Sequence, residues 1–474
     1  MPVRAAAGPR LIQSGVMDDS VPSTPPPARR LPSAAGAVLI VCIALSYFVH
    51  SCFRPVGEIL GKTAEYHALQ ARGFLAGRTS LPVEPAPELL ALKNPYDYKA
   101  NQPYRLHDTS LYRGKYYLYF GPAPALLVFL PYRVLTGHDL PNFVAVPLFC
   151  TAGFLCACAL LYLLAGHHGW DLTLWLELCA ISLLGTASFV FFLVNNARFY
   201  EVAIAAGYLF VHAAFLCLFL ALRSREPRAA WLAASGLLFG FALGSRPDLL
   251  IAAGTAGAAI AYRFWGRWRV MLIFAAGILL CAAGLAWFNY VRFGNPLETG
   301  VQYELTDAYG NGIHLSLGRV LPTLGTYLFT PPAVRPGFPF LRPNWVTVDP
   351  HFPLYGEPFV GILPAAPVLL LGIFAPVFFK LRTAAEADVL RAMHAAAVLL
   401  LLFLALTGYV TGRYLVDFAP LLAFCSAISL LALWGSLGAR SPAVCRATVV
   451  ALCAYSLVVL TAMPAPLGRY FSGL

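Results

Sequence analysis

The feature that most constrains the fold of this chain is a series of long apolar runs. A helix needs about 20 apolar residues to cross the hydrocarbon of a membrane. Only 12% of the 474 residues are charged and 59% are hydrophobic, whereas soluble domains carry about 25% charged residues. The sequence therefore predicts an all-α polytopic membrane protein with about eleven transmembrane helices. The predicted spans are roughly 34–53, 141–166, 172–194, 200–222, 229–245, 247–264, 270–290, 359–380, 392–410, 413–436 and 443–463.

The run at 117–135 decides the orientation of everything after it. It contains Pro122, Pro124 and Pro131 and few uninterrupted apolar residues. If it does not cross, the cationic clusters of the following short loops all fall in the cytoplasm, as the positive-inside rule requires. We therefore expect a helix that lies in, or dips into, the outer interface. The clusters are Arg223, Arg225 and Arg228; Arg263, Arg267 and Arg269; Lys380, Arg382 and Arg391; and Arg440 and Arg446.

This orientation also divides the chain and explains its charge. Residues 1–33, rich in Pro, Ala and Arg, are expected to form a disordered cytoplasmic tail. A single transmembrane domain follows at 34–464, with a short outer tail at 465–474. The net charge of +11 is then the sum of an orientation signal and an outer-face site, and it does not indicate nucleic-acid binding.

Two long loops, 54–140 and 291–358, fall outside and hold most of the carboxylates. Both are rich in Tyr and Pro, and the second also contains Trp345, which favours ordered functional loops over solvated tails. The first is expected to contain juxtamembrane helices and the catalytic residues. The second is a candidate lid, with a rigid interfacial cover as the alternative. Neither the cysteines nor His314 and His351 have the spacing of a metal site, so no cofactor is required, although a divalent metal is left open.

Residues 57–76 predict an amphipathic helix that continues out of the first span. Glu65 shares the polar face with Glu58 and Arg72, since these residues are seven apart. That position above the membrane suits a general base, and a solvated Glu–Arg pair is the alternative. The apolar stripe consists of Leu60, Ala64, Ala68, Ala71 and Leu75.

Residues 94–126 interleave tyrosines with cations and with Asp97 and Asp108. Aromatic rings suit sugars, and cations suit a phosphate or pyrophosphate. An aromatic belt at the headgroups explains the tyrosines but not the density of mixed charge beside them. The tyrosines are Tyr96, Tyr98, Tyr104, Tyr112, Tyr116, Tyr117 and Tyr119.

Several segments, over most of the chain, match the pattern of one family. TAEYHALQARGFLAGRTSL places Glu65 where that family has its first-loop acid, which is more often Asp, and NNARFYEVAIAAGYLF places Glu201 at its second-loop carboxylate. KYYLYFGPAPALLVFLPYRVLTG is similar to its juxtamembrane segment, and FNYVRFGNPLETGVQYEL and GRYLVDFAPLLA to recurrent segments. The chain thus resembles the GT-C superfamily of integral-membrane glycosyltransferases. The resemblance is to the bacterial branch similar to protein O-mannosyltransferases and to aminoarabinose and lipopolysaccharide-core transferases.

This resemblance implies an enzyme of the bacterial inner membrane that uses a polyprenyl-phosphate-linked sugar donor on the periplasmic face. The sugar would pass, with inversion, to a lipid, glycan or protein acceptor. Glu65 is the expected base, with Asp97 and Asp108 as competitors, and Glu201 would orient the acceptor or the base. The expected donor-phosphate contacts are Arg413, Arg292, Arg246 and Lys62, and the expected substrate contacts are Tyr98, Tyr104, Tyr116, Tyr117, Tyr303 and Glu304.

Other interpretations stand beside this one. The three arginines have ion-pair alternatives nearby in sequence, namely Arg246 with Asp248, Arg292 with Glu298 and Arg413 with Asp417. Rival protein classes are a secondary transporter, a lipid-linked glycan polymerase or ligase, and a structural subunit of envelope assembly. Charges at the span ends rather than at the midplane favour an enzyme over a transporter.

Overall fold

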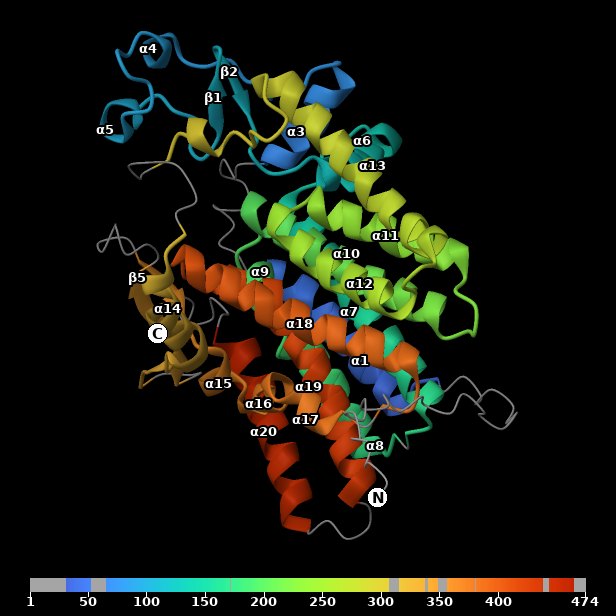
Figure 1. The fold of residues 1–474 in the computed structure, drawn as a ribbon. Coiled ribbons are helices and arrows are strands. Elements are labelled where there is room, and N and C mark those ends of the chain that lie inside the picture. Colours follow the sequence, from blue (N-terminus) through green and yellow to red (C-terminus); the bar gives the residue numbers. More distant parts are fainter. Residues whose placement is uncertain are drawn as a thin grey trace, which may run out of the picture.

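The computed structural model describes residues 31–52, 65–170, 172–306, 315–336, 340–347, 356–379, 381–437 and 443–463. These residues are mainly helical (Figure 1), and seven helices among them are long and apolar enough to cross a membrane. The chain is therefore a multi-pass membrane protein. The predicted tails, apart from residues 31–33, lie outside the described residues. The seven helices are α1 (Ala34–Cys52), α7 (Asn142–His168), α10 (Phe199–Leu222), α13 (Trp268–Phe293), α18 (Ala384–Thr407), α19 (Leu415–Leu437), which follows the 3-10 turn η6 (Gly412–Tyr414), and α20 (Ala443–Ala462).

The other four predicted spans are shorter or broken. Run 172–194 is divided at Phe189, whose φ of 60° lies in the left-handed region. Run 359–380 is cut into short helices, and Pro367 and Pro376 each begin a new piece because proline lacks the backbone N–H that continues a helix. The total of eleven spans therefore stays a prediction. The pieces are α8 (Leu174–Thr186), α9 (Val190–Val194), α11 (Ala229–Leu243), η2 (Pro247–Leu249), α12 (Leu250–Arg263), α15 (Ile362–Ala365), η5 (Pro367–Leu369), α16 (Leu370–Ile373) and α17 (Ala375–Phe378).

The ambiguous run at 117–135 contains a helix too short to cross. A π-helical turn, η1 (Ala125–Phe129), leads into α6 (Leu130–Thr136), and Gly137 ends α6 in the left-handed conformation. The two pieces together are about 18 Å long, well short of the roughly 30 Å of hydrocarbon. The structure thus agrees with a segment that does not span the membrane.

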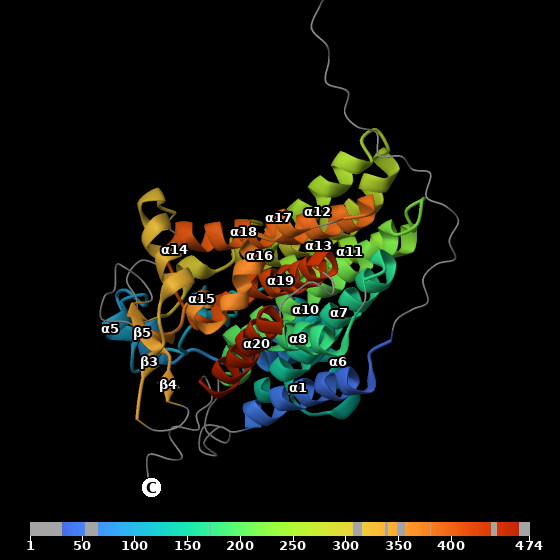
Figure 2. The same ribbon diagram turned by 90° about the horizontal axis from the view of Figure 1, so that it is seen from below.

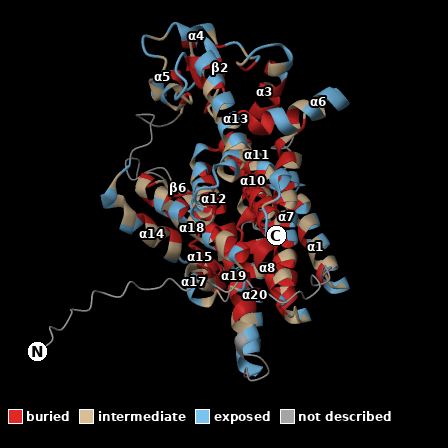
Figure 3. Ribbon diagram, turned by 45° about the vertical axis from the view of Figure 1, so that its right-hand side comes forward, coloured by how far each residue is buried: buried red, intermediate tan, exposed pale blue. Residues whose placement is uncertain are grey.

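Helices α10 and α19 form the centre of the bundle, and α13 lies at its edge. All of the apolar window of α19 and 83% of that of α10 are buried, against 6% for α13. Figure 3 shows the buried residues concentrated on α7, α8, α10 and α19, and Figure 2 shows α7, α10 and α19 among the other helices from a second direction. The few charged residues of α10 and α19 lie near one end of the bundle. The rest of this core is therefore almost wholly apolar.

Helix α13 presents its side chains to lipid. Trp268 at its start and Trp287 and Tyr290 near its end are exposed, and about 30 Å of helix separates them. Aromatic residues at that spacing match the two interfaces of a bilayer. On its other side α13 packs closely on α11, because a Cβ atom at Gly277 would lie 2.7 Å from the Cα of Leu237, and small residues allow such close packing.

Polar contacts gather at the two ends of the bundle. At one end Arg263 pairs with Asp388 at 2.9 Å, and Glu386 holds His167 and His168 at 2.8 and 2.9 Å. These residues belong to loops that the sequence places in the cytoplasm. The two long loops that it places outside meet at the opposite end, which we call the outer end after that prediction.

The first long loop folds into an outer subdomain with a small core of its own (Figure 1). Its helix α3 is shorter than the predicted helix at 57–76: Glu65 caps it, and residues 53–64 lie outside the described residues. Ala68 and Ala71 are buried as the stripe predicts, but Leu75 is 52% exposed, so the stripe ends before it. The elements are α3 (Tyr66–Leu75), α4 (Pro87–Leu90), α5 (Tyr98–Asn101) and the hairpin of β1 (Ser110–Tyr112) with β2 (Lys115–Tyr117).

The second long loop attaches to this subdomain by a short antiparallel bridge. Ser110 faces Glu304, and the backbone of Leu305 bonds to Asp108 and Thr109 at 2.9 Å each. Arg105 adds a bond of 3.1 Å to the carbonyl of Thr306. The two loops are therefore joined where their carboxylates lie. The elements of this loop are η3 (Val301–Tyr303), η4 (Leu317–Arg319), α14 (Val320–Phe329), β3 (Ala333–Val334), β4 (Leu341–Arg342), β5 (Asn344–Thr347) and β6 (Gly356–Phe359).

The sidedness of the two ends can be tested by cysteine labelling. In a background with Cys52 and Cys445 changed to Ser, we expect His138→Cys to react with a membrane-impermeant maleimide in intact cells, because His138 is exposed just after α6. The matched Arg225→Cys, exposed at the opposite end, should react only after permeabilisation. The reverse pattern would invert the orientation.

Candidate functional site

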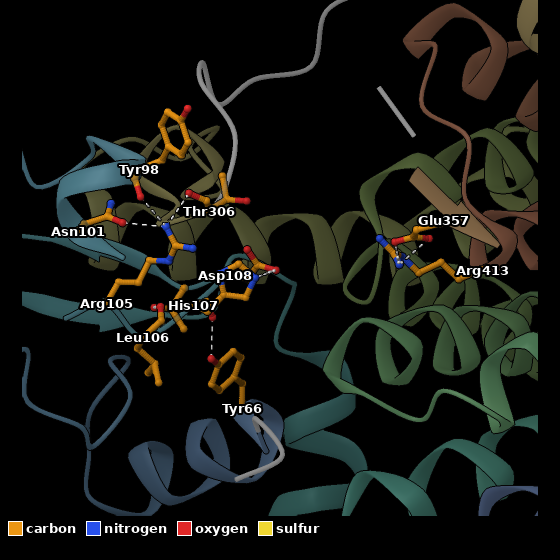
Figure 4. Close-up of polar contacts among 11 residues, drawn as sticks. Tyr66, Tyr98, Asn101, Arg105, Leu106, His107, Asp108, Thr306, Glu357 and Arg413 are labelled. Carbon is orange, nitrogen blue, oxygen red and sulfur yellow. Dashed lines mark hydrogen bonds and ion pairs between the residues drawn. The ribbon is translucent and has the colours of Figure 1, made fainter. Parts of the chain in front are cut away.

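An arginine at the outer end of α19 is the centre of the site. Arg413 Nη1 donates to both carboxylate oxygens of Glu357 on β6, at 3.0 and 3.3 Å (Figure 4). Its guanidinium lies 4.8 Å from the ring centre of Tyr200 and 5.6 Å from that of Tyr414. Glu201, buried in the first turn of α10, is a further electrostatic neighbour. We call Arg413, Tyr200, Tyr414 and Glu201 the Arg413 anion site, because an arginine on aromatic rings suits carboxylate or phosphate.

A second arginine lies beside this site and is neutralised by two carboxylates. Arg246 contacts Asp248 through two bonds of 3.1 Å and Asp417 at 3.1 Å, and it lies 4.9 Å from the ring centre of Tyr414. The predicted alternative of an Arg246–Asp248 pair is thus present. The alternative pair of Arg413 with Asp417 is not, because Arg413 lies in η6, before the helix begins, and turns to Glu357.

A pair of carboxylates, Asp108 and Glu304, lies where the two outer loops join. Asp108 is buried, has a φ of 54°, and pairs with His107 at 3.3 Å (Figure 4). Burial, and then the charge of Asp108, raise the pKa of Glu304 to about 8, and a hydrogen bond with Tyr119 opposes this. Because two neighbouring carboxylates cannot both ionise easily, the raised pKa favours the protonated form of Glu304 at neutral pH. We call these two residues the carboxylate pair.

Tyr119 connects the carboxylate pair with the Arg413 anion site. Burial and the charges of Glu304 and Asp108 raise its pKa well above the ordinary value, and Arg413 opposes that shift. Tyr119 thus hydrogen-bonds with Glu304 and lies within electrostatic range of Arg413. The same end of the bundle therefore offers carboxylates that can accept a proton and a cation that can bind an anion.

The other two predicted base candidates have contacts that stabilise the fold. Glu65 caps α3, and its Oε2 accepts a bond of 2.9 Å from the backbone N–H of Asn142, the first residue of α7. A carboxylate near the N-terminus of a helix stabilises that helix. Through its bond to Asn142, Glu65 therefore joins α3 to the start of α7. Asp97 caps the short helix α5 by accepting from the N–H groups of Lys99 and Ala100. The structure brings only Asp108 of the three into the carboxylate pair.

Arg292, a further cation candidate, has contacts with residues other than those of the Arg413 anion site. Arg292, at the end of α13, donates to the carbonyl of Leu118 and to Asn289, both at 2.6 Å, and lies over the ring of Phe288. These contacts, and not an ion pair with Glu298, hold it. Lys62 lies outside the described residues.

The predicted substrate tyrosines mostly pack within the outer subdomain. Tyr116 belongs to its core, and Tyr117 and Tyr303 stack with Phe293 at ring distances of 5.3 and 5.8 Å. Tyr104 is 40% exposed, and the carbonyl of Tyr98 accepts from Arg105. Glu304, by contrast, lies in the carboxylate pair.

Three aromatic residues of the site were not predicted as site residues. They are Tyr119, Tyr200 and Tyr414. The last two directly adjoin the candidates Glu201 and Arg413 in sequence, and that adjacency was an available signal. Tyr119 was noted only as one of the seven clustered tyrosines, and the sequence did not show that its partner is Glu304 from the other loop. Among the described residues, no group of three or more His, Cys, Asp or Glu side chains could hold a metal ion.

Comparisons with known proteins give a distant likeness to a solved structure. No family model matches the sequence, and no curated protein matches it. Among solved structures, the chain is similar to ArnT from Cupriavidus metallidurans bound to undecaprenyl phosphate, with 16% identity and a TM-score of 0.47. The match covers 84% of this chain but spans only 60% of the length of that one. A likeness of this degree does not by itself establish a shared fold or activity.

The raised pKa of Glu304 predicts a pH-dependent stability. An unfolded Glu titrates near 4.3, and the folded protein holds the proton up to about pH 8. The stabilising contribution of the protonated form is therefore complete at low pH and is lost as pH rises through about 8. We expect Tm in detergent to fall from about pH 4.3, where the unfolded carboxyl titrates, to about pH 8 and to level off above that value, and Glu304→Gln, which stays neutral, to reduce that fall. The exposed control Glu84→Gln should leave it unchanged, and an unaltered fall in Glu304→Gln would contradict the assignment.

Proposed function

We propose that this protein is a membrane glycosyltransferase of the GT-C type that its sequence resembles. It uses a polyprenyl-phosphate-linked sugar donor and glycosylates a lipid, glycan or protein acceptor on the periplasmic face of a bacterial inner membrane. The observation that carries the proposal is that one end of the bundle holds both the carboxylate pair, where the outer loops join, and the Arg413 anion site (Figure 4). A base and a cation so arranged are what transfer from a sugar phosphate requires.

The chemistry assigns one role to each group. Asp108 accepts the proton of an acceptor hydroxyl as the hydroxyl oxygen attacks the anomeric carbon. The bond from that carbon to the phosphate oxygen breaks, and its electron pair leaves with the lipid phosphate. Arg413 stabilises the charge that develops on the phosphate. Attack opposite to the departing group inverts the anomeric centre.

The depth of the Arg413 anion site suits a lipid-linked donor. Arg413 lies in η6, directly before the fully buried helix α19, and so at the boundary of the apolar bundle. A polyprenyl phosphate has its charged group at this level and its chain in the hydrocarbon. The exposed apolar residues of η1 and α6, including Leu127 and Leu135, offer a surface to such a chain at the outer end.

Two rival functions differ in how the structure bears on them. A polymerase or ligase of lipid-linked glycans would use the same base and the same cation, so it remains an alternative choice of acceptor. A solute transporter needs a binding cavity near the midplane. The cavity lined by His212 and Asp417 between α10 and α19 has a volume of about 10 Å³, which is room for about one water molecule, so the observation does not favour a transporter.

The direct test is transfer from a radiolabelled polyprenyl-phosphate sugar by purified protein. We expect Asp108→Asn to lower the rate about 10²- to 10⁴-fold, the usual contribution of a general base. Asparagine tolerates the left-handed conformation that Asp108 adopts, so the folded yield should be retained. The matched control Asp97→Asn, which changes a helix cap, should keep nearly full activity.

The outcomes separate the two parts of the proposal. Equal activity of Asp108→Asn and wild type would remove Asp108 as the base, and a loss in Glu65→Gln without loss of folded yield would move the role to Glu65. Wild-type protein that transfers no sugar from any lipid donor of its native membrane, but carries a solute into proteoliposomes, would contradict the transferase function.

A further inference from the structure

The contact between Glu357 and Arg413 joins two distant parts of the chain. Glu357 lies on β6, which pairs with β5 in a hairpin of the second outer loop, and Arg413 lies at the start of α19. One guanidinium N–H group donates to both carboxylate oxygens. The side chains are 20% and 21% exposed, so water reaches this pair, and the pair can separate without leaving an uncompensated buried charge.

The rest of the Arg413 anion site does not depend on Glu357. Tyr200 and Tyr414 come from α10 and η6, and they flank the guanidinium with their rings. Glu201 is held by the backbone N–H of Arg198 at 3.1 Å, within α10 itself. The arginine is thus positioned by the helical bundle, and the hairpin supplies only the anion that it holds.

A carboxylate and a phosphate compete for the same donors. Both accept charge-assisted hydrogen bonds from a guanidinium, often through two oxygens. Glu357 therefore occupies the position where a phosphate of the ligand would contact Arg413. Since the hairpin and the arginine belong to one chain, this competing anion is always present.

We propose that Glu357 is an internal competitor for the donor phosphate and thereby determines which anions the Arg413 anion site admits. This inference rests on the proposed function, because it assigns the phosphate of a lipid-linked donor to that site. An anion must bind Arg413 better than Glu357 does in order to enter. Chloride and free carboxylates offer Arg413 no more acceptor atoms than Glu357 does and are excluded on this ground, whereas a phosphate, with more acceptor oxygens, displaces the glutamate.

The energetic consequence is a lowered apparent affinity for the ligand. The measured dissociation constant equals the intrinsic value divided by the fraction of protein in which the site is open. Removal of the Glu357 contact should raise that fraction and tighten binding. An ion pair of this exposure contributes only a modest free energy. We therefore expect its removal to lower the dissociation constant about five- to tenfold.

The experiment measures the binding of a polyprenyl phosphate, without sugar, to detergent-purified full-length protein. Glu357→Gln should bind about five- to tenfold more tightly than wild type. Asp139→Asn is the matched control: it also removes one carboxylate from the outer end, where Asp139 pairs with Arg72 and Arg133, and it should bind as wild type does. Glu357→Asp keeps the charge but shortens the side chain, so it should also bind more tightly.

The outcomes distinguish three cases: an effect of the contact between Glu357 and Arg413, an effect of net charge alone, and the absence of a phosphate site. Equal or weaker binding by Glu357→Gln and Glu357→Asp, with wild-type binding intact, would overturn the inference and leave the proposed function standing. Equal tightening in Asp139→Asn would also overturn it, because the effect would then come from net charge alone. If no protein binds the lipid, wild type included, it is the donor assignment of the proposed function that fails.

Discussion

The exclusion of charge from hydrocarbon determines where this protein can perform chemistry. The interior of the bundle offers no water to ionised groups, and the helices α10 and α19 that fill it are almost wholly buried. Charged side chains are therefore placed at the ends of the bundle, where Glu386 holds two histidines at one end and Arg413 and Arg246 hold carboxylates at the other. Among the described residues, the outer end also receives two long loops, so side chains from these loops are combined there with those of the helix ends.

The backbone bridge between the two loops turns that concentration of charge into a defined site. It holds Asp108 beside Glu304, so that one carboxylate raises the pKa of the other. Tyr119 lies within electrostatic range of both this pair and Arg413. Aromatic rings of the bundle position the Arg413 guanidinium, and a glutamate from another hairpin pairs with it. Under the proposed function these groups divide the work into proton acceptance and phosphate binding, and a physical separation of the two roles lets the sugar lie between them.

The sequence was sufficient to predict the membrane class and the gathering of carboxylates in two loops, because both depend on local composition. It also identified Arg413, Glu201, Asp108 and Glu304 as candidates, partly through the family resemblance. It did not show that Asp108 and Glu304 lie together or that Glu65 and Asp97 cap helices, because such contacts depend on the tertiary fold. Periodicity also predicted a buried Leu75, which is exposed at the end of its helix. It predicted one continuous span at 359–380, which prolines divide into short helices.

The most direct test of the central claim is an experimental structure of the protein with a bound polyprenyl phosphate. The account predicts that the phosphate oxygens lie about 3 Å from the Arg413 guanidinium, that Glu357 has left that position, and that the lipid chain runs from there along the apolar surface of the outer end. A phosphate bound elsewhere, with the contact between Arg413 and Glu357 still intact, would contradict it.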